Sequence, residues 1–310
     1  MTFWDKLPKP FLALAPMEDV TDVVFRLTVA RAACPDVFFT EFMNVSGFCH
    51  EQGRESVARR LVFSPTEQPI VAQIWGNNPE NFAQTAIEIA KMGFAGIDIN
   101  MGCPDKKVVK SGGGSALILE PELAKEIIAA TKTAGLPTSV KTRLGYSKVD
   151  EWRPWLTTLL EQNLVGLAIH LRTKKEMSKV LAHRELIGEI AQLRDQIAPN
   201  TKLTINGDIT DRAHAMKLHE EFPSVDGFMI GRGVFANPFC FEDGPRSHSR
   251  EELFELLNYH LDLFDKYEKP KFEPLKRFLK IYVKDFPGSA DLRAKLFECK
   301  NTDEVRALIN

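Results

Sequence analysis

The 310-residue sequence contains only five cysteines, and no two of them have the C-x-x-C spacing of a redox or zinc site. We therefore expect neither a disulfide framework nor a zinc ribbon, and a reducing compartment is favoured. The sequence also lacks an H-E-x-x-H motif and clustered Cys/His spacing, so we expect no bound metal.

Long hydrophobic runs are missing as well. No run approaches the roughly 18 apolar residues of a membrane span, so no membrane partner is expected. The N-terminal segment PFLALAPM (residues 10–17) resembles a signal-peptidase site. However, its apolar run is only about five residues, against roughly 7–15 in a secretory signal, and a first strand explains it better. We expect a cytoplasmic, monomeric protein.

Charge of one sign is not in excess either. The chain has 40 lysines and arginines against 42 aspartates and glutamates, a formal net charge of −2. The total charge therefore does not indicate a nucleic-acid binder, but it does not exclude one, because local basic stripes matter more than totals.

What the sequence does contain is a regular alternation of β-rich apolar runs with helical patterns, which predicts a parallel sheet. Eight such units within about 230 residues match a (β/α)8 TIM barrel. A doubly wound sheet would show fewer strands and a G-x-G-x-x-G after the first one, which is absent. The predicted strands cover residues 11–16, 37–42, 70–76, 95–100, 138–143, 166–173, 202–208 and 226–232.

The pattern changes at Ser249, where a capping box with Glu252 begins a helix. Further helices are predicted over 273–286, 289–299 and 302–309, punctuated by prolines. We therefore expect a barrel domain over residues 1–243, followed by a small all-helical C-terminal domain over residues 244–310.

Nearly every predicted strand ends in a polar side chain or a glycine, at the edge where barrels carry their chemistry. Glycines after strands seven and eight suit a phosphate, and Arg232 would add donors. Gln73, Asn100 and Lys141 could address the edge of a planar heterocycle. A lysine at a strand end, as in TSVKTRLG, is less often a snorkelling or salt-bridged one, whereas His170 could equally be a core histidine. The residues at these ends are Pro16, Met17, Glu41, Gln73, Asn100, Lys141, His170, Asn206, Gly207, Asp208, Gly231 and Arg232.

With these residues placed, the chain resembles the tRNA-dihydrouridine synthases, flavin enzymes that reduce a uracil base in transfer RNA. The N-x-G-C-P loop of DINMGCPDKKVVKSGGGSAL (98–117) and the K-x-R of VKTRLG (140–145) are the most specific matches. Two positions depart from the family: Leu171 replaces a small residue and could reshape the pocket, and Asp19 replaces a common glycine. The other matching segments are APMEDVTD (15–22), TEF (40–42), VAQIWG (71–76), IHLRT (169–173), NGDI (206–209) and IGRGVFANPFCF (230–241).

The resemblance implies a tightly bound FMN, reduced transiently by NADPH or NADH, and a tRNA substrate. Asn100 would hold the uracil edge, and Arg143 would also bind substrate. The flavin phosphate would lie at Asn206, Gly207, Asp208, Gly231 and Arg232, and the ring would be lined by Pro16, Met17, Glu18, Gln73, Lys141 and His170.

The resemblance also implies that Cys103 is the catalytic acid. Hydride addition at C6 of uracil must be followed by protonation of C5, and a thiol with a pKa of about 8.5 still holds its proton near neutrality. Most lone cysteines are inert, and we expect this of Cys34, Cys49, Cys240 and Cys299. Lys106 and Lys107 could lower the pKa of Cys103, which would oppose an acid role.

A basic stripe is predicted on the helix 273–286. Lys276, Lys280 and Lys284 are spaced i, i+4, i+8, within about 80° of arc, and Arg277 adjoins them. Such a stripe is often only a solvated helix face, but it falls in the domain that the family uses to bind RNA. We therefore expect Lys276, Arg277 and Lys280 to contact tRNA phosphates.

Three other functions are compatible with parts of this pattern. One is another FMN barrel acting on a small molecule, such as a dihydroorotate dehydrogenase or an enoate reductase, but the helical tail and the G-C-P loop argue against it. A second is a flavin-free Schiff-base aldolase using Lys141. The third is a catalytically inactive RNA-binding module, which the intact cysteine and phosphate-site residues disfavour.

Overall fold

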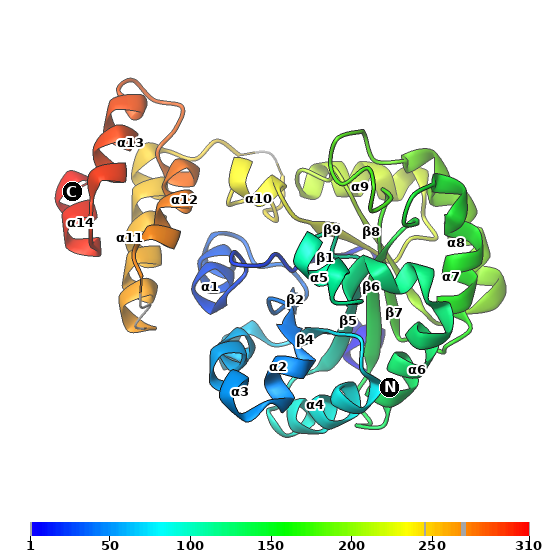
Figure 1. The fold of residues 1–310 in the computed structure, drawn as a ribbon. Helices are drawn as coiled ribbons and strands as arrows, with labels where there is room; N and C mark the ends of the chain where they lie inside the picture. The colour runs from blue at the N-terminus through cyan, green and yellow to red at the C-terminus, as the bar shows by residue number, and fades with distance from the viewer. Residues whose placement is uncertain (1, 245, 268–270, 310) are drawn as a thin grey trace.

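The fold is a parallel β-barrel surrounded by helices, with a helical region at one side (Figure 1). The computed structural model describes residues 2–244, 246–267 and 271–309. The sheet runs in the order β1-β9-β8-β7-β6-β5-β4-β2, all pairs parallel, and a bridge between Ala13 and Val37 joins its two ends. The predicted (β/α)8 barrel is confirmed. Its strands are β1 Phe11–Leu14, β2 Phe38–Phe39, β4 Ile70–Trp75, β5 Gly96–Met101, β6 Thr138–Arg143, β7 Gly166–His170, β8 Lys202–Asn206 and β9 Gly227–Ile230.

The barrel helices begin where the sequence places capping residues. Asn78 accepts a hydrogen bond from the Asn81 N–H and precedes Pro79 at the first helical position, and Asp211 caps the His214 N–H. The helices are α1 Val23–Ala32, α2 Val45–Cys49, α3 Glu51–Ala58, α4 Pro79–Lys91, α5 Lys106–Lys110, α6 Pro121–Lys132, α7 Trp152–Leu160, α8 Ile187–Ile197, α9 Arg212–Glu221 and α10 Gly233–Ala236. Short 3-10 turns are η1 Phe3–Lys6, η2 Arg59–Leu61, η3 Pro65–Glu67, η4 Gly114–Leu119, η5 Val149–Glu151 and η6 Arg184–Leu186.

The second predicted strand, residues 37–42, is wrong as one continuous strand. Within this range β2 covers only Phe38–Phe39, and a separate β3, Met43–Asn44, begins just beyond it; both strands pair with β4. The Thr40 hydroxyl accepts the Gln73 N–H at 2.9 Å, so a side chain replaces a backbone carbonyl in the ladder at this point. Next to this interruption, Glu41 Oε1 accepts a hydrogen bond from the Asp19 N–H at 2.6 Å.

Among the described residues, four helices follow the barrel. They are α11 Arg250–Lys266, α12 Glu273–Tyr282, α13 Ser289–Glu298 and α14 Thr302–Ile309. The capping box of Ser249 and Glu252 starts α11, as predicted. However, α12 ends four residues before the predicted position, and Asp285 takes a left-handed φ of 58° beyond it. Lys284 therefore lies outside the helix, which corrects the predicted i, i+4, i+8 stripe. Within the described ranges, no helix is both long and apolar enough to cross a bilayer.

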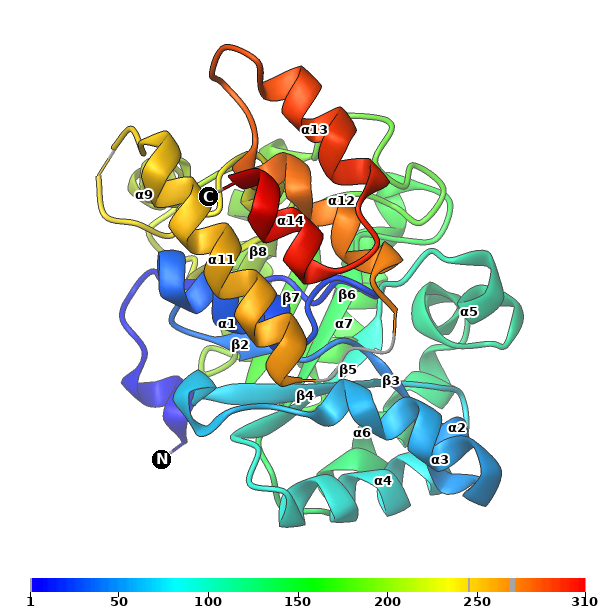
Figure 2. The ribbon, with the colours of Figure 1, turned by 90° about the vertical axis from the view of Figure 1, so that its left-hand side faces the viewer.

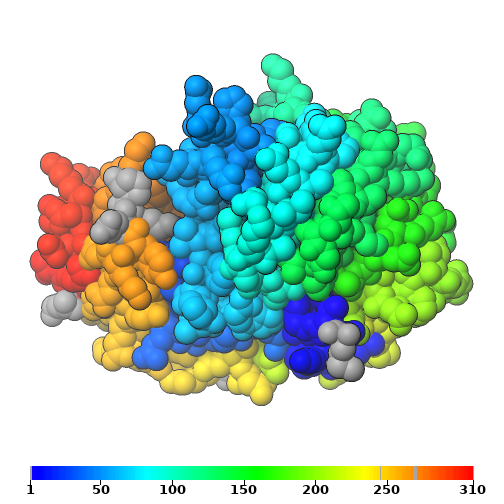
Figure 3. Space-filling model, turned by 90° about the horizontal axis from the view of Figure 1, so that it is seen from below, coloured from blue at the N-terminus to red at the C-terminus, as the bar shows by residue number. Residues whose placement is uncertain are grey.

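The helical region shares its apolar core with the barrel. Along α1, Val23, Val24 and Leu27 pack with Leu263 of α11, and Figure 2 shows these two helices next to each other. Phe278 of α12 stacks on Phe25 of α1 with ring centroids 4.8 Å apart. The space-filling view shows the orange segment directly against the blue part of the barrel, with the red C-terminal segment on its far side (Figure 3). The domain boundary between residues 243 and 244 stays a prediction.

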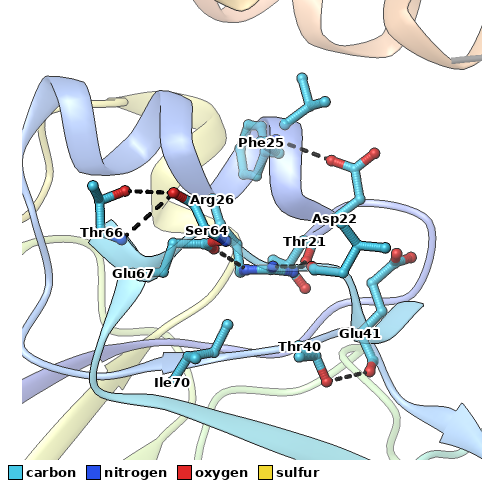
Figure 4. A network of polar contacts seen from close by, with 12 residues as sticks. Thr21, Asp22, Phe25, Arg26, Thr40, Glu41, Ser64, Thr66, Glu67 and Ile70 are labelled. Atoms are coloured by element: carbon cyan, nitrogen blue, oxygen red, sulfur yellow. Dashed lines mark hydrogen bonds and ion pairs between the residues drawn. The ribbon is translucent and has the colours of Figure 1, made fainter. Parts of the chain in front are cut away.

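A buried ion pair fixes α1 to the segment that precedes β4. Arg26 and Glu67 are fully buried, and Arg26 Nε lies 2.5 Å from Glu67 Oε1. Arg26 also donates to the carbonyls of Thr21 and Val62, at 2.7 and 2.8 Å. Figure 4 shows Arg26 reaching from α1 into this network. Because Thr21 in turn bonds the backbone of Met17, the network positions the loop after β1, which carries predicted site residues.

Candidate active site

A cavity of about 600 Å³ opens at the carboxyl ends of the strands, a size typical of small-molecule sites. Segments that follow β1, β5, β6, β7, β8 and β9 line it, because parallel strands bring their carboxyl ends to the same rim. The cavity brings together most of the residues predicted from the sequence. They are Pro16, Met17, Asn100, Cys103, Lys141, Arg143, His170, Asn206, Gly207, Asp208, Gly231 and Arg232.

Five of the residues predicted to bind cofactor or substrate do not line this cavity, and neither does the strand-end residue Glu41, which accepts the Asp19 N–H. Glu18 accepts a 3.0 Å hydrogen bond from Arg60 Nε, and Gln73 is fully buried. The remaining three, Lys276, Arg277 and Lys280, lie on α12.

Gln73 belongs to a hydrogen-bonded relay below the cavity. Asp98 accepts from Gln73 Nε2 at 2.6 Å and from the Ser139 hydroxyl at 2.6 Å. Because Gln73 donates to Asp98, its oxygen faces Asn100 and accepts from Asn100 Nδ2 at 3.0 Å. Asn100 Oδ1 must then face the backbone N–H groups of Gly102 and Cys103, which donate at 3.1 and 2.9 Å. The Asp98 carboxylate therefore orients two amides and, through them, the Cys103 loop.

Burial dominates the electrostatics of the relay. It raises the pKa of Asp98 to about 6, against hydrogen bonds from Ser139 and Gln73 and the nearby charge of Lys141 that lower it. Near neutrality Asp98 is thus mostly ionised and acts as the acceptor at the bottom of the relay.

Cys103 lies in the loop after β5 and faces the cavity. Desolvation by burial raises the pKa of its thiol, and the hydrogen bond from the Asp105 backbone only partly offsets this. Lys106 and Lys107, considered above as groups that could lower this pKa, begin α5 instead. The thiol is therefore protonated near neutral pH and can act as an acid.

The glycine-rich segment 112–114 packs against the Cys103 loop. Gly114 has a φ of 57°, and a Cβ there would lie 2.9 Å from the Cys103 carbonyl oxygen and 2.7 Å from Val108 Cγ1. Only glycine fits this close approach. The Ser115 N–H then donates to the same Cys103 carbonyl at 3.0 Å, which fixes the loop from below.

Lys141 projects from β6 into the cavity. Its Nζ makes a long hydrogen bond of 3.4 Å to Asn206 Oδ1, while Asn206 Nδ2 donates to the Met229 carbonyl at 2.8 Å. Burial, with a smaller contribution from Arg143, lowers the pKa of Lys141 to about 8. This ammonium is close to titration and still has donors to offer a ligand.

His170 is held as a neutral imidazole. Burial and then the charges of Arg143, Lys141 and Arg172 lower its pKa well below the usual value. Arg172 Nη1 lies 3.0 Å from His170 Nε2, and an arginine can only donate, so Nε2 accepts and the ring proton is on Nδ1. Arg172 also pairs with Asp208, whose other oxygen accepts from Arg232 at 3.1 Å.

Arg143 links two loops of the cavity rim. Its Nε donates to the Gly102 carbonyl at 2.8 Å, next to Cys103. Its Nη1 donates to the carbonyls of Thr173 and Met177 at 3.2 and 3.1 Å. The guanidinium therefore connects the Cys103 loop to the segment after β7.

Several residues that line the cavity are not among the predicted site residues, including Phe42, Arg172 and Met177. Arg172 had a signal, since it comes two residues after His170 at a strand end. Phe42 also had a signal, since it ends the predicted strand 37–42 and lies in the matching segment TEF, whereas Met177 had none, because it lies in an irregular loop. Of the two family departures, Leu171 is fully buried in the core away from the cavity, and Asp19 takes a left-handed φ of 56°, which glycine favours.

In the part of the chain that the structure describes, no group of three or more His, Cys, Asp and Glu side chains is arranged to hold a metal ion.

Residues 13–310 match the family model described as dihydrouridine synthase. Curated relatives extend the match to nearly the whole chain. One, named probable tRNA-dihydrouridine synthase, from Staphylococcus aureus (strain COL), is 58% identical over 99% of this chain and 94% of its own length. Another, named probable tRNA-dihydrouridine synthase 2, from Bacillus subtilis (strain 168), is also 58% identical, over 99% of this chain and 95% of its own.

Among solved structures, morphinone reductase in complex with tetrahydroNAD has a similar fold. The TM-score is 0.51 with 13% sequence identity, and the match covers 76% of this chain and 85% of the other. At this identity the likeness describes the shared barrel fold alone.

Proposed function

This chain belongs to the dihydrouridine synthase family, and from that premise we propose that it reduces uridine in tRNA to 5,6-dihydrouridine at the barrel mouth. The identity of 58% to tRNA-dihydrouridine synthases over nearly the whole chain supports this activity. The observation that carries the chemistry is Cys103, a cavity thiol whose pKa is raised by burial. It would be the proton donor to C5.

The cavity fits a flavin mononucleotide. Lys141 is largely buried yet makes a single long hydrogen bond among the described residues, so it has donors left for a flavin ring. At Gly231 a Cβ would find no atom nearer than 3.5 Å, which leaves room for a phosphate against the backbone. Arg232 lies next to this position with its side chain 63% exposed. Gly207, Asp208 and Asn206 would complete the phosphate end, and Pro16, Met17 and His170 would line the ring.

A bound, reduced flavin would supply the hydride that adds to C6 of the uracil ring. Cys103 would then give its Sγ proton to C5, and the positive charges of Arg143 and Lys141 would stabilise the thiolate that remains. Asn100 would hold the Cys103 loop in place through its two backbone hydrogen bonds. One N–H of its amide remains for the uracil edge.

The partners follow from this reaction. NADPH or NADH would reduce the flavin, and tRNA would be the substrate, which would place the enzyme in the cytoplasm. We propose that it works as a monomer, with the basic residues of α12 along the RNA backbone.

The sequence left three alternatives, and the family match over residues 13–310 argues against each of them. The aldolase alternative can be tested at Lys141, because a lysine with a pKa of about 8 could form a Schiff base with a carbonyl substrate. Borohydride would then trap a Lys141 adduct in a colourless protein.

The proposed activity is tested by mass analysis of nucleosides in tRNA from a strain that lacks this protein. We expect at least one dihydrouridine to disappear and to return when the wild-type gene is restored. The purified protein should be yellow and release FMN rather than FAD. Unchanged dihydrouridine at every tRNA position would contradict the proposal.

A further inference from the structure

The segment between β7 and η6 combines exposed apolar side chains with lysines at the cavity rim. In residues 174–181, here called the rim loop, Met177, Val180 and Leu181 are 44%, 43% and 84% exposed. Scattered single apolar residues on a surface are ordinary, but three within five positions beside a cavity are not. Met177 itself lines the cavity.

The exposure does not come from a loosely held backbone. Arg172 Nε donates to the Val180 carbonyl at 2.8 Å, and the Ala182 N–H donates to Asp208 Oδ2 at 2.9 Å. Leu181 lies between these two anchored peptides, and both anchoring side chains line the cavity. A firmly held backbone thus presents the most exposed large hydrophobic side chain of the described residues to solvent.

The charges of the rim loop select the kind of partner. Lys175 and Lys179 are exposed and form no ion pair with a described residue, whereas Glu176 turns inward to cap the Thr173 N–H at 2.7 Å. Lysine is depleted at protein–protein interfaces but is the usual contact for nucleic-acid phosphates. The outer face is therefore basic and apolar together, which fits RNA.

We propose that Leu181 is a wedge that enters the base stack of the tRNA when the target uridine leaves it. This inference rests on the proposed function, because the C5=C6 bond cannot reach the cavity while the base is stacked, and extrusion costs free energy. An apolar side chain inserted at the vacated step offsets that cost. Lys175 and Lys179 contact the phosphates that flank the step.

The test compares Leu181→Ser with Leu181→Met and with Ile87→Ser. Ile87 is also exposed, at 46%, but lies on the outer helix α4 and serves as the matched control. Flavin-reduced enzyme is mixed with saturating unmodified tRNA transcript, and single-turnover dihydrouridine formation is followed by nucleoside mass analysis. We expect Leu181→Ser to slow this step about tenfold, with Leu181→Met and Ile87→Ser near the wild-type rate.

Flavin content, the rate of flavin reduction by NADPH and the Kd for tRNA separate the alternatives. We expect all three to stay close to wild type in Leu181→Ser, since a wedge acts after binding and away from the flavin. A wild-type rate in Leu181→Ser, a weaker Kd with an unchanged rate, or lost flavin would each overturn the wedge while leaving the proposed function intact. Wild-type enzyme that forms no dihydrouridine would overturn the proposed function, and the wedge with it.

Discussion

The barrel mouth and the basic stripe of α12 are both predicted from the sequence, but the folded chain uses them differently. At the mouth, twelve predicted residues from six strand ends face one cavity. On α12, Lys276 pairs with Glu273 at 2.8 Å, and Arg277 donates to the Asp19 carbonyl at 2.9 Å. Lys284, beyond the helix, bonds the Ala236 carbonyl. Charged side chains on a helix surface can pair with neighbouring groups of the same chain. In a closed parallel barrel, by contrast, the carboxyl ends of all strands meet at one rim, so their side chains face the same cavity.

The largest effect should come from Cys103→Ala. Removal of a general acid lowers turnover by roughly 10²–10⁴-fold. Flavin content and anaerobic reduction by NADPH should be unchanged, because accepting hydride does not need the thiol. Stopped-flow flavin absorbance and nucleoside mass analysis measure the two half-reactions separately. Cys34→Ala, at an exposed cysteine, is the control, and full turnover by Cys103→Ala would remove the acid role.

The next effect is on stability, through Asp98→Asn. The folded pKa of Asp98, about 6, lies above its ordinary value of 3.8, so the folded state binds more protons in this window and wild-type stability falls as pH rises through it. Asparagine does not titrate, so the unfolding free energy of Asp98→Asn relative to wild type should rise between pH 4 and pH 7, by about 2 kcal/mol. Thermal unfolding at several pH values measures this as a growing difference in Tm.

Two further expected results test the same interpretation of Asp98. The asparagine introduced by Asp98→Asn can accept from Gln73 while it donates to the Ser139 hydroxyl, so the orientation of the relay and the turnover should survive. Ser139→Ala removes a hydrogen bond that lowers the pKa of Asp98, so the pH window should move upward. A Tm difference that is independent of pH would show that Asp98 does not titrate as described.

Arg232→Ala should weaken flavin binding about 10–100-fold, the cost of losing a hydrogen bond to a charged group. Arg212→Ala is a suitable control, because Arg212 also pairs with an aspartate, Asp243 at 3.2 Å, but does not line the cavity. Flavin release on dilution, followed by fluorescence, measures the difference. Equal retention in both variants would exclude Arg232 from the phosphate end.

The smallest effect is expected from the basic stripe. Lys280 is exposed, whereas Lys276 and Lys284 already have partners within the chain. Lys280→Gln should change the slope of log K against log salt by about 0.7, one phosphate contact, and Lys276→Gln by less. Titration of labelled tRNA at several salt concentrations measures both slopes. If neither slope changes, the basic residues of α12 form only a solvated helix face. Of the two predicted regions, the barrel mouth alone would then bind a ligand.

How far the sequence predicts the site depends on the range of the interactions. Alternating apolar runs and helix caps are local signals, and they locate all eight barrel strands. Five of the predicted strands nevertheless end two or three residues beyond the observed ends, and β2 is interrupted. The predicted end of α12 is wrong because the chain leaves the helical conformation at Val283, before the left-handed Asp285, and no local signal marks this point. Glu18 and Gln73 follow the family pattern, yet their partners Arg60 and Asp98 lie 42 and 25 residues away.

The sequence by itself determined the barrel and the set of side chains that its strands deliver to one rim, because the period of each element is a property of the local chain and the alternation of strands with helices favours a parallel sheet. Only the tertiary structure decided which of those side chains stay available for a ligand. Burial set the protonation of Cys103, Asp98 and Lys141. The orientation of Asn100 and the rigid exposure of Leu181 depend on partners far along the chain, since hydrogen bonds and desolvation act between neighbours in space.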